Sequence, residues 1–219
     1  DEVCVCEMSQ ANVEQISRII EIAGSDPAGW RKTTLEERHK IMYEAANRLG
    51  EMRGDLIGCM CAITGKTVVE GDVEVSEGLD YARFYTTSMK LFADLPDVDI
   101  TPEGTVLVIS PWNFPCAIPI GGIVAALAGG NTVILKPATV AAPVAWLFAQ
   151  AFWDAGVPKE ALQVIITDRD ALKVLTSAPA IKHIILTGGT DTAQNIARSN
   201  PSTPVSYTHL RAHETKANL

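Results

Sequence analysis

The sequence predicts an α/β fold in which a helical segment (residues 1–100) precedes a parallel α/β segment (residues 101–205). Two observations predict it. Apolar residues recur at helical spacing up to about residue 100, and beyond Thr101 short β-rich runs alternate with helical patterns. The β-rich runs are apolar on both faces, which is typical of a parallel sheet covered by helices on both sides.

The helical segment is expected to contain three main helices. The first is indicated by the apolar positions Val13, Ile16, Ile20 and Ala23. The second begins after a capping-box pattern, in which Thr34 is followed three residues later by Glu37. Its apolar face continues through Ile41, Ala45, Leu49, Met52 and Leu56. The third runs from about Val73 to Phe92, and its inward positions are Val75, Leu79, Ala82, Met89 and Phe92.

An acidic run lies near the start of the third helix and comprises Glu70, Asp72, Glu74 and Glu77. Carboxylates there suit the positive end of the helix dipole, so these side chains are expected to face water. A pair of catalytic carboxylates is the alternative interpretation.

The α/β segment is expected to contain four strands with helices between them. The strands are predicted at residues 105–110, 132–136, 162–167 and 181–187, and the helices at residues 118–130, 142–156, 170–178 and 190–199. In such a sheet, ligands bind beyond the carboxyl ends of the strands. The residues that follow those ends are therefore the candidate site.

Lys136 is the first candidate, because it is the only Asp, Glu, Lys, Arg or His between Gly104 and Trp153. It ends a strand, so its stem can pack while its ammonium reaches the crevice. A buried ammonium without a partner is costly. Its partner is either a distant acid or the hydroxyls and phosphate of a ligand.

Two further candidates follow other strands. Gly188 and Gly189 connect a strand to a helix, where backbone N–H groups can approach an anion, although a plain turn also explains them. The G-x-G-x-x-G fingerprint is absent. Asn113 lies between two prolines, so its amide is either a fixed oxyanion donor or a tie for the loop. Its neighbours Trp112 and Phe114 more often serve packing.

Composition excludes several classes of partner. The net charge of −8 leaves no basic stripe for nucleic acid. The uncharged run from Ile118 to Leu135 has the length of a membrane span, but its glycines, Pro119 and Asn131 divide it into two elements, so no membrane partner is expected.

The cysteines and histidines also predict no special site. The five Cys fit reduced thiols in a cytoplasmic protein, and Cys116 is interpreted as a pocket wall. His209 and His213 have the spacing of ligands on one helix face, but a solvated or foreign tail is the favoured interpretation, so no metal is expected.

Three motifs carry a family resemblance. SPWNFP (residues 110–115), LKPA (135–138) and LTGGT (186–190), in this order and spacing, resemble the aldehyde dehydrogenase superfamily. The resemblance covers residues 11–205 and implies the N-terminal, Rossmann-like NAD(P)-binding domain of such an enzyme, truncated. The sequence around these motifs is similar to that of the proline-catabolic branch of the superfamily. It implies NAD- or NADP-dependent oxidation of glutamate semialdehyde, derived from 1-pyrroline-5-carboxylate, to glutamate through a thiohemiacetal.

The resemblance also implies residue roles. Asn113 would stabilise the oxyanion, Lys136 would bind the adenosine ribose, and Phe114 and Cys116 would face the aldehyde tunnel. The other implied cofactor-binding residues are Ile109, Ser110, Pro111, Trp112, Thr139, Gly188, Gly189 and Thr192. Many NAD-preferring relatives have Glu where Thr139 stands, so some tolerance of NADP is expected.

The departures from the family pattern are equally specific. A Glu-x-Gly-Gly-Lys stretch with the general base is expected just after Val205, and a nucleophilic cysteine later, yet neither is in this sequence. Residues 206–219 are therefore predicted to be a non-native tail on a domain of residues 1–205. The start without Met suggests a piece of a longer protein, and these 219 residues alone are expected to be inactive.

Intact relatives are expected to be homo-oligomers. The alternatives left open are a non-catalytic nucleotide-binding module and an aldehyde dehydrogenase of other specificity, such as an acyl-CoA reductase.

Overall fold

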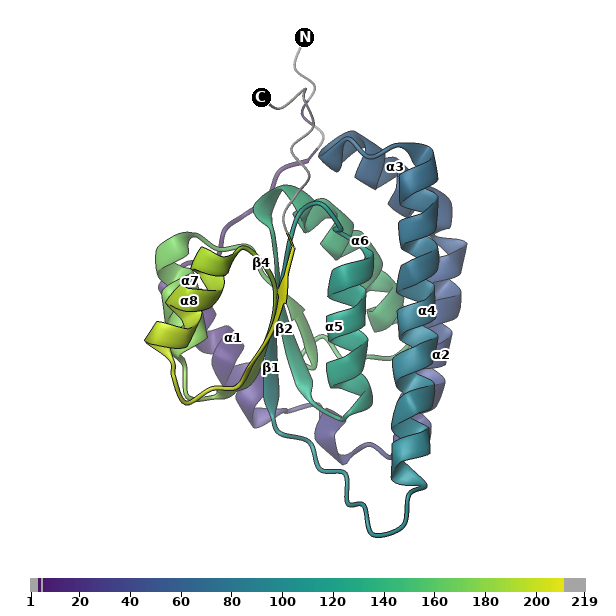
Figure 1. The fold of residues 1–219 in the computed structure, drawn as a ribbon, viewed down its shortest axis with the longest axis vertical. Coiled ribbons are helices and arrows are strands. Elements are labelled where there is room, and N and C mark those ends of the chain that lie inside the picture. Colours follow the sequence, from purple (N-terminus) through teal and green to yellow (C-terminus); the bar gives the residue numbers. More distant parts are fainter. Residues whose placement is uncertain (1–3, 5, 211–219) are drawn as a thin grey trace.

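The computed structural model describes residue 4 and residues 6–210. As predicted, helices precede a parallel sheet (Figure 1). The helical segment comprises α1 (Val13–Ser25), the 3-10 helix η1 (Trp30–Lys32), α2 (Leu35–Glu51), α3 (Arg53–Thr64) and α4 (Val68–Ala93). The α/β segment comprises β1 (Thr105–Ser110), α5 (Ala117–Ala128), β2 (Thr132–Pro137), the 3-10 helix η2 (Thr139–Ala141), α6 (Ala142–Asp154), β3 (Leu162–Val164), α7 (Arg169–Ser177), β4 (Ile181–Gly188), α8 (Thr190–Ser199) and β5 (Val205–His209).

Capping boxes begin three of the helices. The box predicted at Thr34 is confirmed, since its side chain accepts from the backbone N–H of Glu37 and the Glu37 carboxylate accepts from that of Thr34. Equivalent boxes begin α1 at Asn12 and α4 at Thr67. The Thr67 box starts α4 at Val68, earlier than the predicted Val73, because Thr67 and Glu70 satisfy two otherwise unpaired N–H groups.

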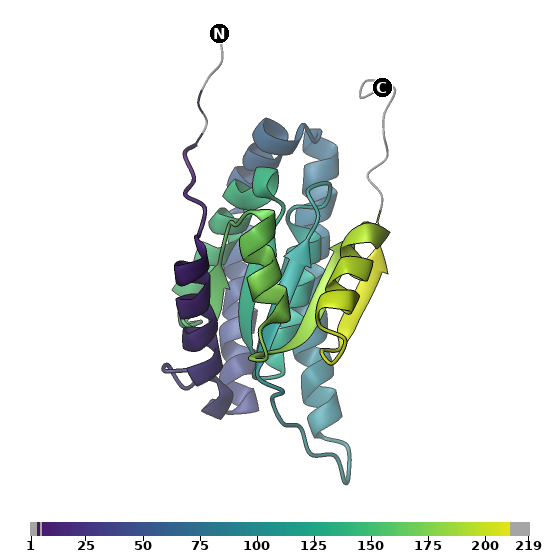
Figure 2. The same cartoon turned by 90° about the vertical axis from the view of Figure 1, so that its left-hand side faces the viewer.

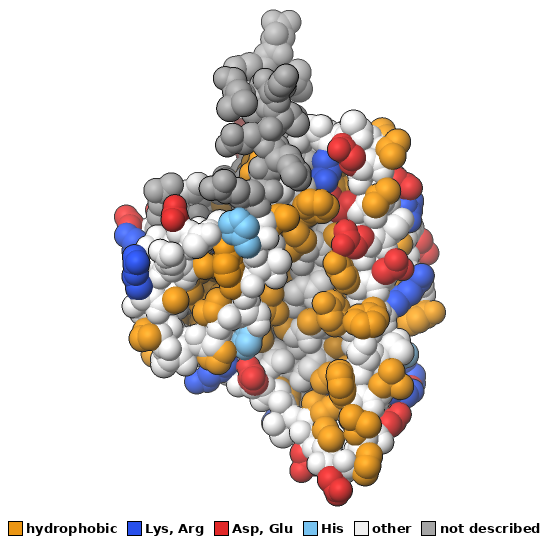
Figure 3. All heavy atoms as spheres, viewed as in Figure 1, with side chains coloured by type: hydrophobic (Ala, Val, Ile, Leu, Met, Phe, Trp, Pro, Cys, Tyr) orange, Lys and Arg blue, Asp and Glu red, His pale blue; other side chains and the backbone are white. Residues whose placement is uncertain are grey.

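Two predicted helical details are wrong. The apolar face from Ile41 to Leu56 does not belong to one helix, because the chain turns at Met52 between α2 and α3. Gly50 and Gly54 flank this turn, and glycine has a low helix propensity. Phe92 was expected to point inward but is 57% exposed, because the end of α4 extends beyond α5 (Figure 1). Hydrophobic side chains gather at the surface at this end of the molecule (Figure 3).

The sheet has five parallel strands in the order β3-β2-β1-β4-β5. The four predicted strands are confirmed, although β3 is shorter than expected. The fifth strand, β5, was not predicted: it contains His209 and pairs with β4. His209 lies on a strand, so it does not fit the alternative in which His209 and His213 share one helix face; His213 is outside the described residues. That residues 206–219 are non-native stays a prediction.

Helices cover both faces of the sheet (Figure 2). Side chains alternate along the strands. Val106 and Val108 of β1 pack with α2, α4, α5 and α6, whereas Leu107 and Ile109 pack with α1, α7 and α8. This alternation confirms the expectation of a sheet buried on both faces.

Within residues 4 and 6–210, no helix combines the length and the apolar character that a membrane crossing requires. The uncharged run from Ile118 to Leu135 is divided between α5 and β2, as its turn signals indicate.

Candidate functional site

The carboxyl ends of the central strands meet at one edge of the sheet. Ile109 of β1 lies opposite Lys136 of β2 and Leu186 of β4, and Ser110 lies opposite Pro137. The backbone N–H of Ala138 donates to the Ser110 carbonyl oxygen at 3.0 Å and holds the two strand ends together. The sequence motifs SPWNFP, LKPA and LTGGT therefore lie side by side, as parallel pairing requires.

Lys136 lies at this edge with a half-buried side chain. Burial lowers the pKa of its ammonium below the ordinary value of 10.5. Within the described residues, no carboxylate lies within ion-pair distance of its ammonium. The distant acid considered as its partner is therefore absent from this part of the chain, and the ammonium is free to bind a ligand.

Ser110 provides a second free group. Its side chain is 4% exposed, and its hydroxyl oxygen is buried without a hydrogen-bond partner in the described structure. A buried hydroxyl without a partner costs free energy. A polar ligand at the strand ends would relieve that cost.

The loop after β1 holds Pro111, Trp112, Asn113 and Phe114. Trp112 is 41% exposed and Phe114 is 36% exposed, so neither is a core residue. In the described part of the chain, the Asn113 side chain makes no hydrogen bond to protein atoms, so its amide does not tie the loop.

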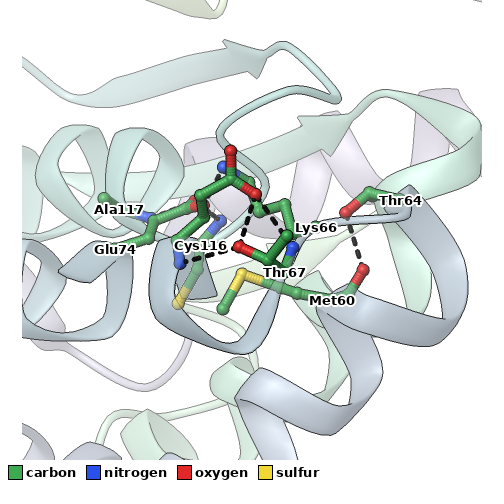
Figure 4. A network of polar contacts seen from close by, with 8 residues as sticks. Met60, Thr64, Lys66, Thr67, Glu74, Cys116 and Ala117 are labelled. Atoms are coloured by element: carbon green, nitrogen blue, oxygen red, sulfur yellow. Dashed lines mark hydrogen bonds and ion pairs between the residues drawn. The ribbon is translucent and has the colours of Figure 1, made fainter. Parts of the chain in front are cut away.

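A buried ion pair lies behind this loop, and sequence reasoning missed it. Glu74 of α4 was expected to face water, but it is 1% exposed. Its Oε1 accepts hydrogen bonds from the backbone N–H groups of Cys116 (2.7 Å) and Ala117 (3.1 Å). Its Oε2 lies 2.9 Å from Lys66 Nζ, which lies 4.4 Å from the centre of the Phe114 ring. Figure 4 shows Glu74 and Lys66 converging on the start of α5.

Cys116 is a core residue. It has no exposed surface and belongs to the cluster of buried side chains between the sheet and α2–α6. Burial is the main cause that raises the pKa of its thiol far above the ordinary value, and the carboxylate of Glu74 adds to it. A thiol in this state is a poor nucleophile. The burial argues against the expected position of Cys116 in a substrate tunnel.

The glycines at the end of β4 leave open space. Neither Gly188 nor Gly189 has a positive φ, and an added Cβ at Gly189 would meet nothing within 4 Å. Neither backbone strain nor packing thus requires glycine at position 189. Gly189 precedes α8, whose N-terminus has no side-chain cap, and Thr192 lies exposed in the first turn. An uncapped helix N-terminus can bind a phosphate. In this structure, the Tyr207 hydroxyl and His209 Nδ1 lie 3.4 Å and 3.3 Å from Thr190 Oγ1, at the start of α8.

Thr139 and a hollow in the surface lie at the margin of this edge. Thr139 is exposed in η2, separated from the end of β2 by one residue. A hollow of about 490 Å³ between the N-terminal segment and α6 is lined in part by Met8, Trp146 and Val164, and none of its lining residues belongs to the predicted site. Among the described residues, no three His, Cys, Asp or Glu side chains are grouped as metal ligands.

Comparison with known proteins decides the family. A sequence model described as "Aldehyde dehydrogenase family" matches residues 1–210. The chain belongs to the aldehyde dehydrogenase family. The family match includes residues 206–210, at the start of the segment predicted to be non-native.

Individual members of the aldehyde dehydrogenase family agree with this assignment. A 1-pyrroline-5-carboxylate dehydrogenase from Geobacillus sp. strain WCH70 is 32% identical over 195 residues, which are 84% of this chain and 38% of that protein. The structure of proline utilization A (PutA) from Corynebacterium freiburgense matches with a TM-score of 0.85 and 33% identity, over 95% of this chain and 21% of that one. An NAD-dependent benzaldehyde dehydrogenase from Corynebacterium glutamicum matches with a TM-score of 0.87 and 25% identity, over 95% of this chain and 49% of that one. The chain thus spans well under half of the curated relative.

Proposed function

We propose that this chain is the dinucleotide-binding part of an aldehyde dehydrogenase, and that the whole enzyme oxidises glutamate semialdehyde to glutamate. The observation that carries the proposal is the group of unpartnered polar atoms at the strand ends. Lys136 Nζ has no carboxylate partner and Ser110 Oγ has no hydrogen-bond partner among the described residues.

The residues at this edge fit NAD or NADP. Lys136 would donate to a ribose hydroxyl, and the N-terminus of α8 after Gly189 would face the pyrophosphate. Ile109, Ser110, Pro111 and Trp112 would lie along the cofactor, and Thr192 would contact it from the first turn of α8. When bound, the nicotinamide supplies the acceptor for the hydride of the aldehyde.

Asn113 would act directly on the reacting carbonyl. Its amide N–H would donate to the oxygen that becomes negatively charged when a nucleophile adds to the aldehyde. The amide has no hydrogen bond within the described structure, so no internal bond must break first. Phe114, exposed beside it, would contact the aldehyde chain.

The substrate assignment is supported by resemblance. The Geobacillus relative is named as a 1-pyrroline-5-carboxylate dehydrogenase, and proline utilization A shares the fold at 33% identity. The alternative specificities have a counterpart in the benzaldehyde dehydrogenase, which shares the fold at 25% identity. The match of residues 1–210 to a family of aldehyde-oxidising enzymes favours an enzyme over a non-catalytic nucleotide-binding module.

Three measurements test the proposal. Calorimetric titration of the purified chain with NAD should give saturable binding, and no binding to the wild-type chain would contradict the cofactor assignment. Long-read sequencing of the source DNA across codon 205 should continue into Glu-x-Gly-Gly-Lys and a later Cys. The protein from that longer frame should reduce NAD with glutamate semialdehyde, whereas the 219 residues alone should not. Faster turnover of benzaldehyde than of glutamate semialdehyde would overturn the substrate assignment.

A further inference from the structure

The buried pair of Glu74 and Lys66 joins three elements that are distant in the sequence. Glu74 lies on α4, Lys66 lies in the connection between α3 and α4, and the N–H groups that Glu74 binds begin α5. The Cys116 N–H is 42 residues from Glu74 in the chain. The contact therefore fixes tertiary structure rather than a local turn.

Glu74 caps a helix that has no cap of its own. The N-cap residue of α5, Cys116, makes no side-chain hydrogen bond to its helix. The first N–H groups of a helix need acceptors, and a carboxylate there also suits the positive end of the helix dipole. Glu74 Oε1 provides both for the N–H groups of Cys116 and Ala117.

The packing of α4 on α5 brings the carboxylate to this position. At Gly78, an added Cβ would lie 3.1 Å from Ile120 Cδ1, and at Gly121 it would lie 3.1 Å from Tyr81 Cδ2. Both glycines therefore let the helices approach closely. Figure 1 shows α4 and α5 side by side, and Glu74 lies one turn before Gly78.

Lys66 extends the contact to the loop that holds Asn113. Its ammonium neutralises the buried carboxylate and lies 4.4 Å from the centre of the Phe114 ring, where a cation is attracted to the ring face. The loop is thus held on both sides of Pro115: at the Phe114 ring by Lys66 and at the Cys116 N–H by Glu74. Asn113 directly precedes Phe114.

We propose that Glu74 and Lys66 are positioning residues for Asn113: the pair holds the backbone of the loop between β1 and α5, and with it the position from which the Asn113 side chain projects. This inference rests on the proposed function, in which Asn113 stabilises the oxyanion. Neither residue touches the substrate in this proposal, and both act through Phe114 and the start of α5.

The test follows the backbone amide of Asn113 in the purified chain by ¹⁵N NMR relaxation. Its resonance is identified by its shift in Asn113→Asp. In Glu74→Gln and Lys66→Met, the heteronuclear NOE of this amide should fall towards that of a mobile loop. In Lys66→Arg, which keeps a cation able to stack on Phe114, it should return to the wild-type value. Hydrogen exchange at the Cys116 and Ala117 amides should also be about tenfold faster in Glu74→Gln, because a charge-assisted acceptor becomes neutral.

The chain offers a matched control in another Lys–Glu pair. Lys90 and Glu36 lie 3.3 Å apart, and their side chains are 48% and 59% exposed. Glu36→Gln should leave both readouts unchanged. The proposal is overturned if Glu74→Gln and Lys66→Met lower the stability of the chain while the order of the Asn113 amide stays at the wild-type value. If Glu74→Gln does not fold, the Lys66 variants decide by the same criterion.

The outcome is independent of the proposed function. The order of Asn113 is measured on the free chain, whereas the function is tested by dinucleotide binding and turnover. A rigid Asn113 in a chain that does not bind NAD would contradict the function alone. Binding of NAD with an Asn113 amide unaffected by Glu74→Gln and Lys66→Met would contradict the positioning role alone.

Discussion

Replacement of Lys136 by Met should have opposite effects on dinucleotide binding and on stability. Methionine keeps the length and apolar stem of the side chain but removes the ammonium. If Lys136 binds a ribose hydroxyl, the variant loses a hydrogen bond from a charged donor, which contributes about 1.5–3 kcal/mol. The dissociation constant for NAD should therefore rise about ten- to a hundredfold.

The free chain should be at least as stable with Met as with Lys. Burial lowers the pKa of Lys136 from its ordinary value of 10.5, so the charged form is less favourable in the folded chain than in the unfolded chain. This penalty is fully present below the folded-state pKa and disappears as the pH rises from there to the ordinary value. The wild-type chain should therefore gain stability relative to the Met variant as the pH rises through that window.

Calorimetric titration with NAD and urea unfolding at neutral and alkaline pH measure both effects. Lys173→Met is a matched control, because Lys173 is 75% exposed on α7 and pairs with Asp170 instead of lying at the strand ends. An unchanged dissociation constant for Lys136→Met would refute the ligand role. A Met variant less stable than the wild type at pH 7 would show that Lys136 has a structural partner.

Three further predictions concern packing, cofactor choice and capping. Gly122→Ala should lower the free energy of unfolding by about 1–3 kcal/mol, because the new Cβ would lie 2.9 Å from Val108 Cγ1. Gly58→Ala, whose new Cβ would meet nothing within 4 Å, should raise the free energy of unfolding by about 0.5–1 kcal/mol. Equal effects of the two variants in urea unfolding would refute the close packing of Gly122 on β1. Thr139→Glu should weaken NADP binding by at least about tenfold while NAD binding persists, since a carboxylate repels a 2′-phosphate; competition titrations check this, and a strong preference of the wild type for NAD would contradict it. Thr67→Ala removes the side-chain cap of α4 and should cost about 1 kcal/mol, which thermal unfolding measures; an unchanged melting temperature would show that the cap is dispensable.

Much of the candidate site was predictable because it depends on strand direction alone. Once the runs at residues 105–110, 132–136 and 181–187 are parallel strands, their carboxyl ends must meet at one edge. The isolation of Lys136 in the sequence likewise anticipated its lack of a carboxylate partner in the described structure. The capping box of α4 could also have been predicted, since Thr67 and Glu70 repeat the pattern found at Thr34 and Glu37.

Two predictions from the sequence were wrong because they depend on contacts between distant segments. Glu74 follows exposed Asp72 on an acidic stretch of helix, and by sequence the two look alike. Cys116 was expected in a pocket wall, yet packing against the helices α2–α6 buries it completely. A third error is local: the turn at Met52 was missed because the apolar spacing continues through it.

By itself, the sequence determined the order of the main helices and of the strands β1–β4, the edge where the site lies and the identity of Lys136 and Asn113 as candidates. These depend on local periodicity and on the direction of strands, which neighbouring residues encode. Only the tertiary structure decided that Glu74 is buried, that Lys66 pairs with it and that the pair contacts the loop of Asn113. A carboxylate can leave water only where donors from other segments replace its hydration, and the N–H groups of α5 reach Glu74 only after α4 and α5 have packed together.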